Sequence, residues 1–292
     1  MSLTDPALPA CLSGEDPGAV HEDHLALAAA CAPGVALCTI VGIDGSFSRR
    51  IGAQLAIRPD GSFAGSLADG CLEAQLRTDA QGATTPVVRR YGRDSGVVDF
   101  RLPCGGGLDI LIDPVPDRAA CAAAMTALTA RRAATISLPP NPHLGARRYL
   151  PCLAIRAFGE GPELGALERI AAAAGVVCQG VEKSGLSLGR RSGLPDADRW
   201  TAIVMLFHDH EWEIALLDEA LASDAFYVGA QGGFTARAAR LEALRERGAD
   251  PVALARVRSP IGRPSGSRSP QTLALAILAE VAGEYERLRT NP

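Results

Sequence analysis

The sequence predicts an α/β protein, in which an N-terminal α+β domain precedes a C-terminal Rossmann-like domain with a doubly wound parallel sheet. From Pro151 onward, short apolar strands alternate with amphipathic helices, an order typical of parallel sheets with right-handed crossovers. Upstream, strands and helices follow one another without that alternation. A stretch rich in Pro, Gly and Arg separates the two patterns. We therefore expect domains over residues 1–137 and 151–292, joined by a linker over 138–150.

The N-terminal domain is expected to begin with a helix over residues 19–32, which a Pro-Gly pair closes. The apolar run VALCTIVGI predicts a strand, and the chain returns as a second strand over 54–58. A loop of glycine and small residues leads into a helix from about Asp69. The remaining predicted elements are the strands VVRRYG and GLDILIDPV and an alanine-rich helix over 117–132.

The C-terminal domain shows the more regular pattern. Its strands are predicted by four apolar runs: CLAIRAF, VVCQGV, TAIVMLF and AFYVGA. Its helices are predicted by four amphipathic segments: residues 162–174, 211–222, 235–247 and 270–289. In such a sheet the carboxyl ends of the strands meet at one edge, which is where α/β proteins bind ligands.

Composition and charge exclude several classes of protein. Hydrophobic residues make up 47% of the chain, ample for a core, and the formal net charge is −4. Nucleic acid is not expected as a partner, because phosphate binding needs a concentrated basic surface. No apolar run approaches the roughly 18 residues of a membrane helix, and no leader pattern opens the chain. We therefore expect a cytoplasmic protein with no membrane partner.

Two of the eight cysteines lie in glycine-rich segments, and none of the eight forms a C-x-x-C pair. Cys71 ends GSLADGC, where Ser66 and the glycines supply backbone N–H groups and a helix begins, a placement that favours a thiolate nucleophile or metal ligand. Cys104 precedes Gly105 and Gly106, which suggest a close approach of the backbone to another group. The alternative for either cysteine is a buried, inert thiol.

An arginine-rich loop follows the first strand. The segment DGSFSRRIGA carries Ser46 and Arg49 among further hydroxyls and a second arginine. Arginines with hydroxyls suit an anionic phosphate or pterin-like ligand, and a solvated basic loop is the alternative.

The segment FGEGPEL is expected at a strand-to-helix turn. Gly159 permits the tight turn, and Gly161 lets the backbone approach a phosphate at the start of the helix. Glu182 ends the next strand, where an acidic residue commonly bonds a ribose hydroxyl. Leu164 occupies the place of the third glycine of a dinucleotide motif. The segment therefore predicts either a site for a nucleotide-like phosphate or a Rossmann-like fold whose pocket is vestigial.

His208 and Asp209 directly follow the strand TAIVMLF, at the ligand-binding edge of the predicted sheet. The histidine could carry a proton or bind phosphate, with Asp209 setting its tautomer. Residues that merely begin a helix or loop are the alternative.

These segments together resemble the XdhC/CoxI family of molybdenum-enzyme maturation factors. The resemblance runs from about residue 34 to 286 and takes in both domains in the expected order. Asp69 departs from the family pattern, since a glycine is usual there, and Gly232-Gly233-Phe234 replaces a usual Gly-Ser-Arg. The matching blocks are Gly45-Ser46 through Gly52-Ala53, GSLADGCLE, Cys104-Gly105-Gly106 with Asp113-Pro114, FGEGPEL, VMLFHDHEWE, FYVGAQGGFTARAARLEAL and SPIGRPSGSRSPQTLALAILAEV.

The resemblance implies a chaperone that binds a molybdopterin-type cofactor, assists its sulfuration and inserts it into an apo molybdenum hydroxylase such as xanthine dehydrogenase. It implies a cysteine desulfurase as a further partner, a homodimer as the assembly, and no catalytic turnover. Cys71 and Cys104 are then the candidate molybdenum contacts. The residues expected at the cofactor are Ser46, Arg49, Ser66, Cys71, Cys104, Gly105, Gly106, Gly159, Gly161, Glu182, His208, Asp209 and Gly229.

Two other functions match parts of the sequence. An NAD(P)-dependent oxidoreductase would explain Gly159, Gly161 and Glu182, but it leaves the segments around Cys71 and Cys104 without a role. An adaptor that binds only proteins would leave the glycine-rich loops as simple turns.

Overall fold

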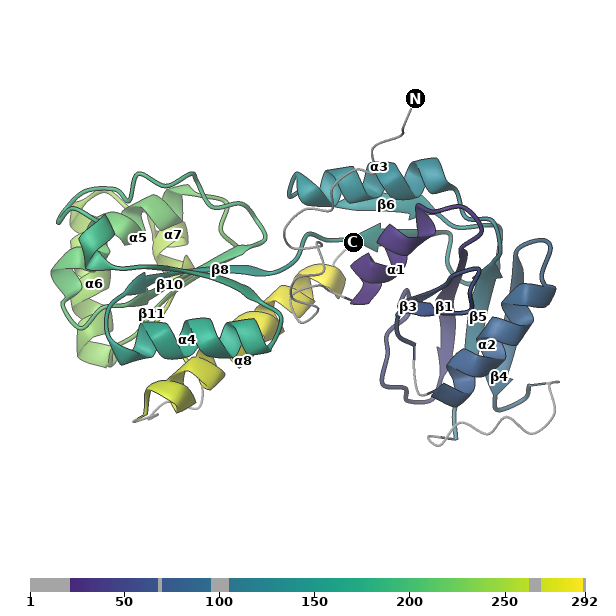
Figure 1. The fold of residues 1–292 in the computed structure, drawn as a ribbon. Coiled ribbons are helices and arrows are strands. Elements are labelled where there is room, and N and C mark those ends of the chain that lie inside the picture. Colours follow the sequence, from purple (N-terminus) through teal and green to yellow (C-terminus); the bar gives the residue numbers. More distant parts are fainter. Residues whose placement is uncertain (1–21, 68–69, 96–104, 263–268, 291–292) are drawn as a thin grey trace, which may run out of the picture. The chain divides into compact units, whose positions relative to one another are not determined.

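A computed structural model describes residues 22–67, 70–95, 105–262 and 269–290 of the chain (Figure 1). The chain folds into two compact units, of which unit 1 extends to Pro151 and unit 2 begins at Cys152. Unit 1 contains an antiparallel sheet with helices and unit 2 a parallel one, which confirms the predicted fold class. No helix in the described part of the chain is long and apolar enough to cross a membrane.

Unit 1 is built on a five-stranded antiparallel sheet with the order β3-β2-β1-β5-β4. Asp44 at the end of β1 pairs with Gly107 at the start of β5, which in turn pairs with Gly92 at the end of β4. These three strand ends therefore lie at one edge of the sheet. The strands are β1 (Ala36–Asp44), β2 (Gln54–Ile57), β3 (Phe63–Gly65), β4 (Val87–Gly92) and β5 (Gly107–Asp113).

Hydrophobic clusters form on both faces of this sheet. Because successive side chains of a strand point to opposite faces, Cys38 is buried in the cluster that includes Leu72 of α2, whereas Leu37 is buried with Leu27 of α1 and Met125 of α3. The helices are α1 (Glu22–Ala30), α2 (Gly70–Gly82) and α3 (Arg118–Thr129).

The segment predicted as a linker carries a strand in the structure. β6 (Ala134–Ser137) and β7 (Ala146–Tyr149) pair as an antiparallel hairpin, so residues 138–150 hold its loop and its returning strand. The prolines and the glycine that suggested a linker lie in the hairpin loop, and the following strand is short.

Buried hydrogen bonds hold the end of this hairpin to the rest of unit 1. The Tyr149 hydroxyl donates to Gln54 Oε1 at 2.7 Å, and the Gln54 amide nitrogen donates to Thr39 Oγ1 at 2.9 Å. His24 Nε2 lies 2.9 Å from the carbonyl oxygen of Leu150. These partners are distant in sequence, so a local pattern does not reveal them.

Unit 2 contains a five-stranded sheet with the order β12-β11-β10-β8-β9, and every paired neighbour runs parallel. The chain passes from β8 to β9 on one side and then to β10 on the other, which creates a topological switch point beside β8. β12 is an addition to the prediction. The strands are β8 (Ala154–Gly159), β9 (Val177–Val181), β10 (Thr201–Leu206), β11 (Tyr227–Ala230) and β12 (Val257–Arg258).

Helices cover both faces of this parallel sheet, with α4 and α8 on one face and α5 and α7 on the other (Figure 1). The core on the second face includes Phe158 and Met205 of the sheet, packed with Leu217 of α5, Leu244 of α6 and Leu254 of α7. The helices are α4 (Pro162–Ala173), α5 (Glu213–Ala222), α6 (Phe234–Glu246), α7 (Pro251–Arg256) and α8 (Pro270–Thr290), of which α7 was not predicted.

Candidate functional site

Two loops lie against each other at the edge of unit 1 where β1 ends and β5 begins. Gly45 lies close to Gly106, and a Cβ atom on Gly106 would stand 2.6 Å from the carbonyl oxygen of Asp44. Phe47 packs against the core and anchors its loop, while Ser46 is exposed. Gly106 is therefore a glycine because the neighbouring backbone occupies the space of a side chain.

A third loop, between β3 and α2, reaches the same edge. The Arg49 guanidinium Nε donates to the carbonyl oxygen of Ser66 at 3.5 Å. Glu73, in the first turn of α2, accepts from the Ser66 hydroxyl at 3.0 Å and from the Leu67 N–H at 3.2 Å. The Glu73 carboxylate thus accepts hydrogen bonds from a hydroxyl and a backbone N–H of the loop before α2. Acidic residues in the first turn of a helix commonly have this role.

Cys71 is the second residue of α2, and its side chain is exposed. The other described cysteines are buried or half-buried, and burial raises the pKa of Cys38 and Cys121 to about 12. Those two thiols stay protonated at neutral pH and pack as small apolar groups. Among the described cysteines, Cys71 is accordingly the most accessible to a ligand, and Cys104 lies outside the described residues.

The predicted residues of unit 1 therefore gather at one edge. Ser46 and Arg49 lie on the loop after β1, Gly105 and Gly106 immediately precede β5, and Ser66 follows β3. Cys71 begins the helix that this last loop enters. The edge presents an arginine, a hydroxyl, backbone groups and a thiol, a combination that can hold an anionic, sulfur-containing ligand.

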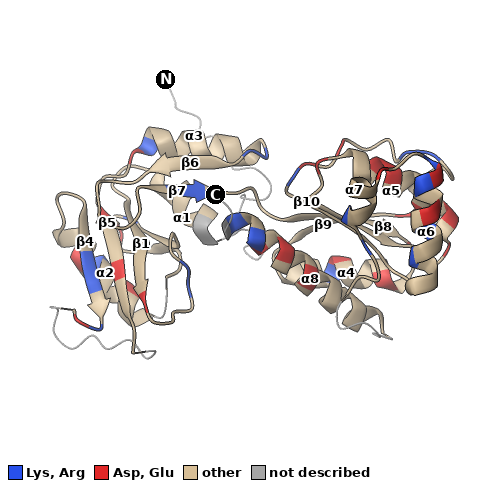
Figure 2. Ribbon diagram, turned by 180° about the vertical axis from the view of Figure 1, so that it is seen from behind, with Lys and Arg blue, Asp and Glu red and all other residues tan. Residues whose placement is uncertain are grey.

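A charged cluster near this edge is formed by side chains of β1, β4 and β5 that the sequence alone does not bring together. The Arg90 guanidinium contacts Asp109 Oδ2 at 2.9 Å and Asp44 Oδ2 at 3.0 Å, so one cation on β4 links the ends of β5 and β1. A Cβ on Gly107 would collide with the Arg90 guanidinium, and one on Gly42 would stand 2.7 Å from Asp109 Oδ2. Basic and acidic segments lie side by side on β4 and β5 (Figure 2). The sequence signal that could have revealed this cluster is the alternation of side chains along β4, which turns Arg90 and Arg89 to opposite faces of the sheet.

In unit 2 the predicted turn follows β8. A Cβ on Gly159 would stand 2.8 Å from Leu206 Cβ, so this glycine allows β8 and β10 to approach closely at their ends. Gly161 has a φ of +81° and immediately precedes α4. Leu164, at the place of the third glycine, is 3% exposed and helps to bury α4 against the sheet. The side chain of Leu164 therefore separates α4 from the sheet at the position where dinucleotide-binding folds have a glycine that lets the helix and the strand approach closely.

An ion pair lies where the loops after β8, β9 and β10 meet. Lys183 Nζ is 2.6 Å from Glu160 Oε1 and 3.9 Å from Asp209 Oδ2. The same ammonium lies over the rings of Phe207 and Trp212, at 5.9 and 5.4 Å from their centroids. The Asp209 carboxylate also accepts from the Glu211 N–H at 3.2 Å, so it caps the turn that follows β10.

Not every predicted residue of unit 2 faces a common site. Glu182 is exposed after β9. Gly229 is buried in β11, and a Cβ there would meet Ile261 Cγ2 at 2.6 Å and the Tyr227 ring. Gly229 therefore makes room for packing in the structure and does not reach the carboxyl edge.

A pocket of about 500 Å³ lies at the carboxyl edge of unit 2, beyond β10, β11 and β12. Its polar lining includes Glu163 of α4, His208 and His210 after β10, and Gln231 after β11. Of the predicted residues that the structure describes, His208 lines this pocket, whereas Gly159, Gly161, Glu182, Asp209 and Gly229 do not.

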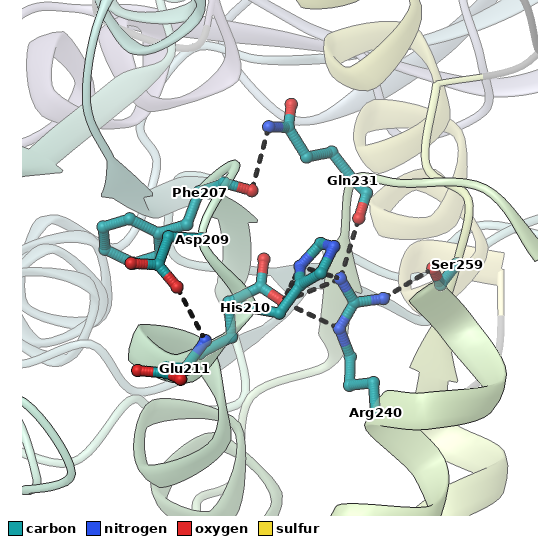
Figure 3. A network of polar contacts seen from close by, with 8 residues as sticks. Phe207, Asp209, His210, Glu211, Gln231, Arg240 and Ser259 are labelled. Atoms are coloured by element: carbon teal, nitrogen blue, oxygen red, sulfur yellow. Dashed lines mark hydrogen bonds and ion pairs between the residues drawn. The ribbon is translucent and has the colours of Figure 1, made fainter. Parts of the chain in front are cut away.

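A buried network supports the floor of this pocket (Figure 3). The Arg240 guanidinium donates from Nε to Glu213 Oε2 at 2.8 Å, from Nη2 to the Gln231 carbonyl oxygen at 2.8 Å and from Nη1 to Ser259 Oγ at 3.0 Å. His210 Nδ1 lies 3.1 Å from Glu213 Oε2. Burial raises the pKa of Glu213, although the Arg240 charge opposes the shift. The network joins the loops after β10 and β11 and so positions His210 and Gln231.

Comparison with known proteins identifies both units. Residues 30–92 match the XdhC and CoxI family, and residues 155–281 match the XdhC Rossmann domain. The chain is 30% identical over 268 residues to the molybdenum cofactor insertion chaperone PaoD of Escherichia coli strain K12, a match that covers 85% of this chain and 83% of that protein. A crystal structure of a xanthine dehydrogenase from Bacillus halodurans has a TM-score of 0.68, with 17% identity and coverage of 93% of this chain and 97% of that one. At that identity the likeness concerns the fold alone.

Proposed function

The chain belongs to the XdhC and CoxI family, and from this premise we propose that it is a chaperone that carries molybdenum cofactor to a molybdenum enzyme. The observation that carries the proposal is the relative from E. coli, which is a molybdenum cofactor insertion chaperone and matches this chain across both units. In this role the protein binds and delivers a cargo, and it does not turn over a substrate.

The edge of unit 1 supports this proposal by its chemistry. The cofactor is a pterin phosphate whose sulfur atoms hold a soft metal. The exposed thiol of Cys71 is a soft ligand, and Arg49 is a cation suited to phosphate. The closely packed glycines beside Ser46 leave backbone near the cargo without intervening side chains.

The alternative of an NAD(P)-dependent oxidoreductase receives less support from unit 2. Two carboxylates, those of Glu160 and Glu163, flank Gly161 at the turn where the pyrophosphate of a dinucleotide would lie. Lys183 compensates the charge of Glu160, but the Glu163 carboxylate repels a pyrophosphate, and Leu164 occupies the place of the close glycine contact. We therefore assign no hydride-transfer function.

We further propose a molybdenum hydroxylase of the xanthine dehydrogenase type as the client, with assistance to sulfuration of the cofactor before insertion. A cysteine desulfurase is then a second partner, and an accessible thiol at the cargo is compatible with receiving sulfur from it. A homodimer is the proposed assembly.

The test is activation of a purified apo-hydroxylase of this type. Protein isolated from cells that make the cofactor should restore hydroxylase activity, and Arg49→Ala and Cys71→Ser should each lower the restored activity. Arg58→Ala is the matched control, because Arg58 follows the end of β2 at the opposite edge of the sheet. Wild-type protein that restores no activity would contradict the proposed client.

A further inference from the structure

The arginine-rich loop after β1 ends in a tight turn. The Ala53 N–H donates to the Arg50 carbonyl oxygen at 3.1 Å, and Gly52, the third residue of the turn, has a φ of +86°. A positive φ at this place is typical of a type II turn. The Gly52 N–H donates to the Ile40 carbonyl oxygen at 2.7 Å and so ties the turn to β1. The turn therefore fixes the point at which the loop rejoins the sheet, three residues after Arg49.

A side chain of β7 lies across this turn. Arg147 Nε donates to the Gly52 carbonyl oxygen at 2.6 Å. A Cβ on Gly52 would stand 2.9 Å from both Cδ and Nε of Arg147, so the arginine lies directly against the glycine. Gly52 is buried and Arg147 is half-buried. The guanidinium thus supplies a hydrogen-bond donor to a buried residue, and it occupies the space that a side chain at position 52 would need.

The neighbouring residues of β7 hold Arg147 in this place. Arg147 and Tyr149 are two residues apart in the strand, so their side chains point to the same face. The Arg147 guanidinium carbon lies 4.8 Å from the centroid of the Tyr149 ring, and the buried Tyr149 hydroxyl donates to Gln54. Two side chains of β7 therefore contact Gly52 and Gln54, on either side of the point where the loop joins β2.

The other end of the same loop is held by different contacts. Gly45 lies close to Gly106, and Phe47 packs against the core. Arg49 lies between these fixed points, half-buried, and its Nε donates to the Ser66 carbonyl oxygen. A loop that is fixed at both ends loses less conformational freedom when it binds a ligand, so its arginine binds an anion more tightly.

We propose that Arg147 is a positioning residue of the site in unit 1. It acts through the turn at Gly52 and holds the Arg49 guanidinium in the arrangement that binds the phosphate of the cargo. This inference rests on the proposed function, which names the cargo. It assigns a role to the hairpin of β6 and β7, which lies outside the two segments that match the family, residues 30–92 and 155–281.

The test measures pterin per folded chain in protein that is produced together with active cofactor biosynthesis and purified without oxygen. Arg147→Met keeps an unbranched side chain beside Gly52 and removes the donor. It should lower the bound pterin by about 2- to 10-fold, which corresponds to the net contribution of one hydrogen bond. Arg147→Lys keeps a charged donor and should bind more pterin than Arg147→Met.

Arg58→Met is the matched control. Arg58 Nη1 also donates to a backbone carbonyl oxygen, that of Phe63 at 2.9 Å, but it follows the end of β2 at the opposite edge of the sheet. This variant should bind as much pterin as the wild type.

Hydrogen exchange of the cofactor-free chain tests the contact without any cargo. Arg147→Met should speed exchange of the Gly52 and Ala53 amides by about 2- to 10-fold, because the turn loses the bond that holds it. Peptides from α5 in unit 2 should exchange as in the wild type, which separates a loosened turn from a general loss of stability.

Equal pterin per folded chain in the wild type and Arg147→Met would overturn this inference and leave the proposed function intact. The inference is also overturned if exchange at Gly52 and Ala53 is unchanged, if Arg147→Lys binds no more pterin than Arg147→Met, or if Arg58→Met loses as much pterin as Arg147→Met. A wild type without pterin would instead refute the proposed function, and with it the role of Arg147.

Discussion

The carboxylate of Glu213 and the guanidinium of Arg240 form a wholly buried ion pair, with Oε2 and Nη2 2.7 Å apart. The pair joins the start of α5 to α6, and it bonds to His210 and to the backbone of Gln231 below the pocket of unit 2. Glu213 Oε1 has no hydrogen-bond partner among the described residues. The carboxylate therefore depends on Arg240 for most of the compensation of its burial.

Replacing Arg240 by Met should destabilise unit 2 by about 3–5 kcal/mol, because it leaves an uncompensated charge in the interior. The double variant Arg240→Met with Glu213→Leu should recover much of this loss, since both charges are then absent. Urea denaturation monitored by circular dichroism measures both free energies of unfolding. A double variant as unstable as the single one would refute the dependence of Glu213 on Arg240.

The same variant should show a pH-dependent defect. Burial already raises the pKa of Glu213 in the folded protein, and loss of the Arg240 charge raises this pKa further. A carboxyl whose pKa is raised in the folded protein binds more protons in the folded state than in the unfolded state. The stability that this carboxyl contributes is therefore lost as the pH rises above 4.5, the ordinary pKa of a glutamate. The destabilisation by Arg240→Met should therefore grow between pH 5 and pH 8. Denaturation midpoints that differ from the wild type by a constant amount across this range would contradict this.

Gly106→Ala should destabilise unit 1 by about 1–3 kcal/mol, because the added Cβ would stand 2.6 Å from the Asp44 carbonyl oxygen and one of the two loops must shift. Gly70→Ala is the matched control, since a Cβ at Gly70 meets nothing within 4 Å. Chemical denaturation should give Gly70→Ala a free energy of unfolding equal to or higher than that of the wild type. Equal stability of Gly106→Ala and the wild type would show that these loops are not held together.

Alkylation of the native protein with iodoacetamide should modify Cys71 before any other described cysteine. Cys71 is exposed, whereas Cys38 and Cys121 are buried and their pKa of about 12 keeps them protonated. Peptide mapping by mass spectrometry after short exposures gives the order of modification. In the denatured chain the three thiols should react at similar rates. Early modification of Cys38 would contradict the burial of β1 beneath α2.

The sequence predicted the parallel sheet of unit 2 because each strand there is an apolar run and each helix has a regular apolar face. The hairpin of β6 and β7 escaped prediction because its stability depends on distant partners, such as Gln54 for Tyr149. β12 escaped because two residues are too few for a pattern.

The candidate site was predictable in part. The cluster of loops in unit 1 followed from cysteines, glycines and arginines placed beside strand ends, and the structure brings its described members to one edge. In unit 2 the dinucleotide motif points to Gly161 and Glu182, but neither lines the pocket, which extends from Glu163 past the end of β10 to the ends of β11 and β12. Glu163 lines the pocket but was overlooked, because the motif assigns roles to its glycines and not to the residues between them.

The amount of molybdenum and pterin bound per chain decides whether this protein carries molybdenum cofactor. The protein should be produced together with active cofactor biosynthesis, purified without oxygen and analysed by metal and pterin assays, with Cys71→Ala and Cys104→Ala beside the wild type. We expect near-stoichiometric pterin in the wild type and less in Cys71→Ala. A wild-type protein without pterin, whose thermal unfolding is shifted upward by NAD(P), would contradict the claim and favour an oxidoreductase.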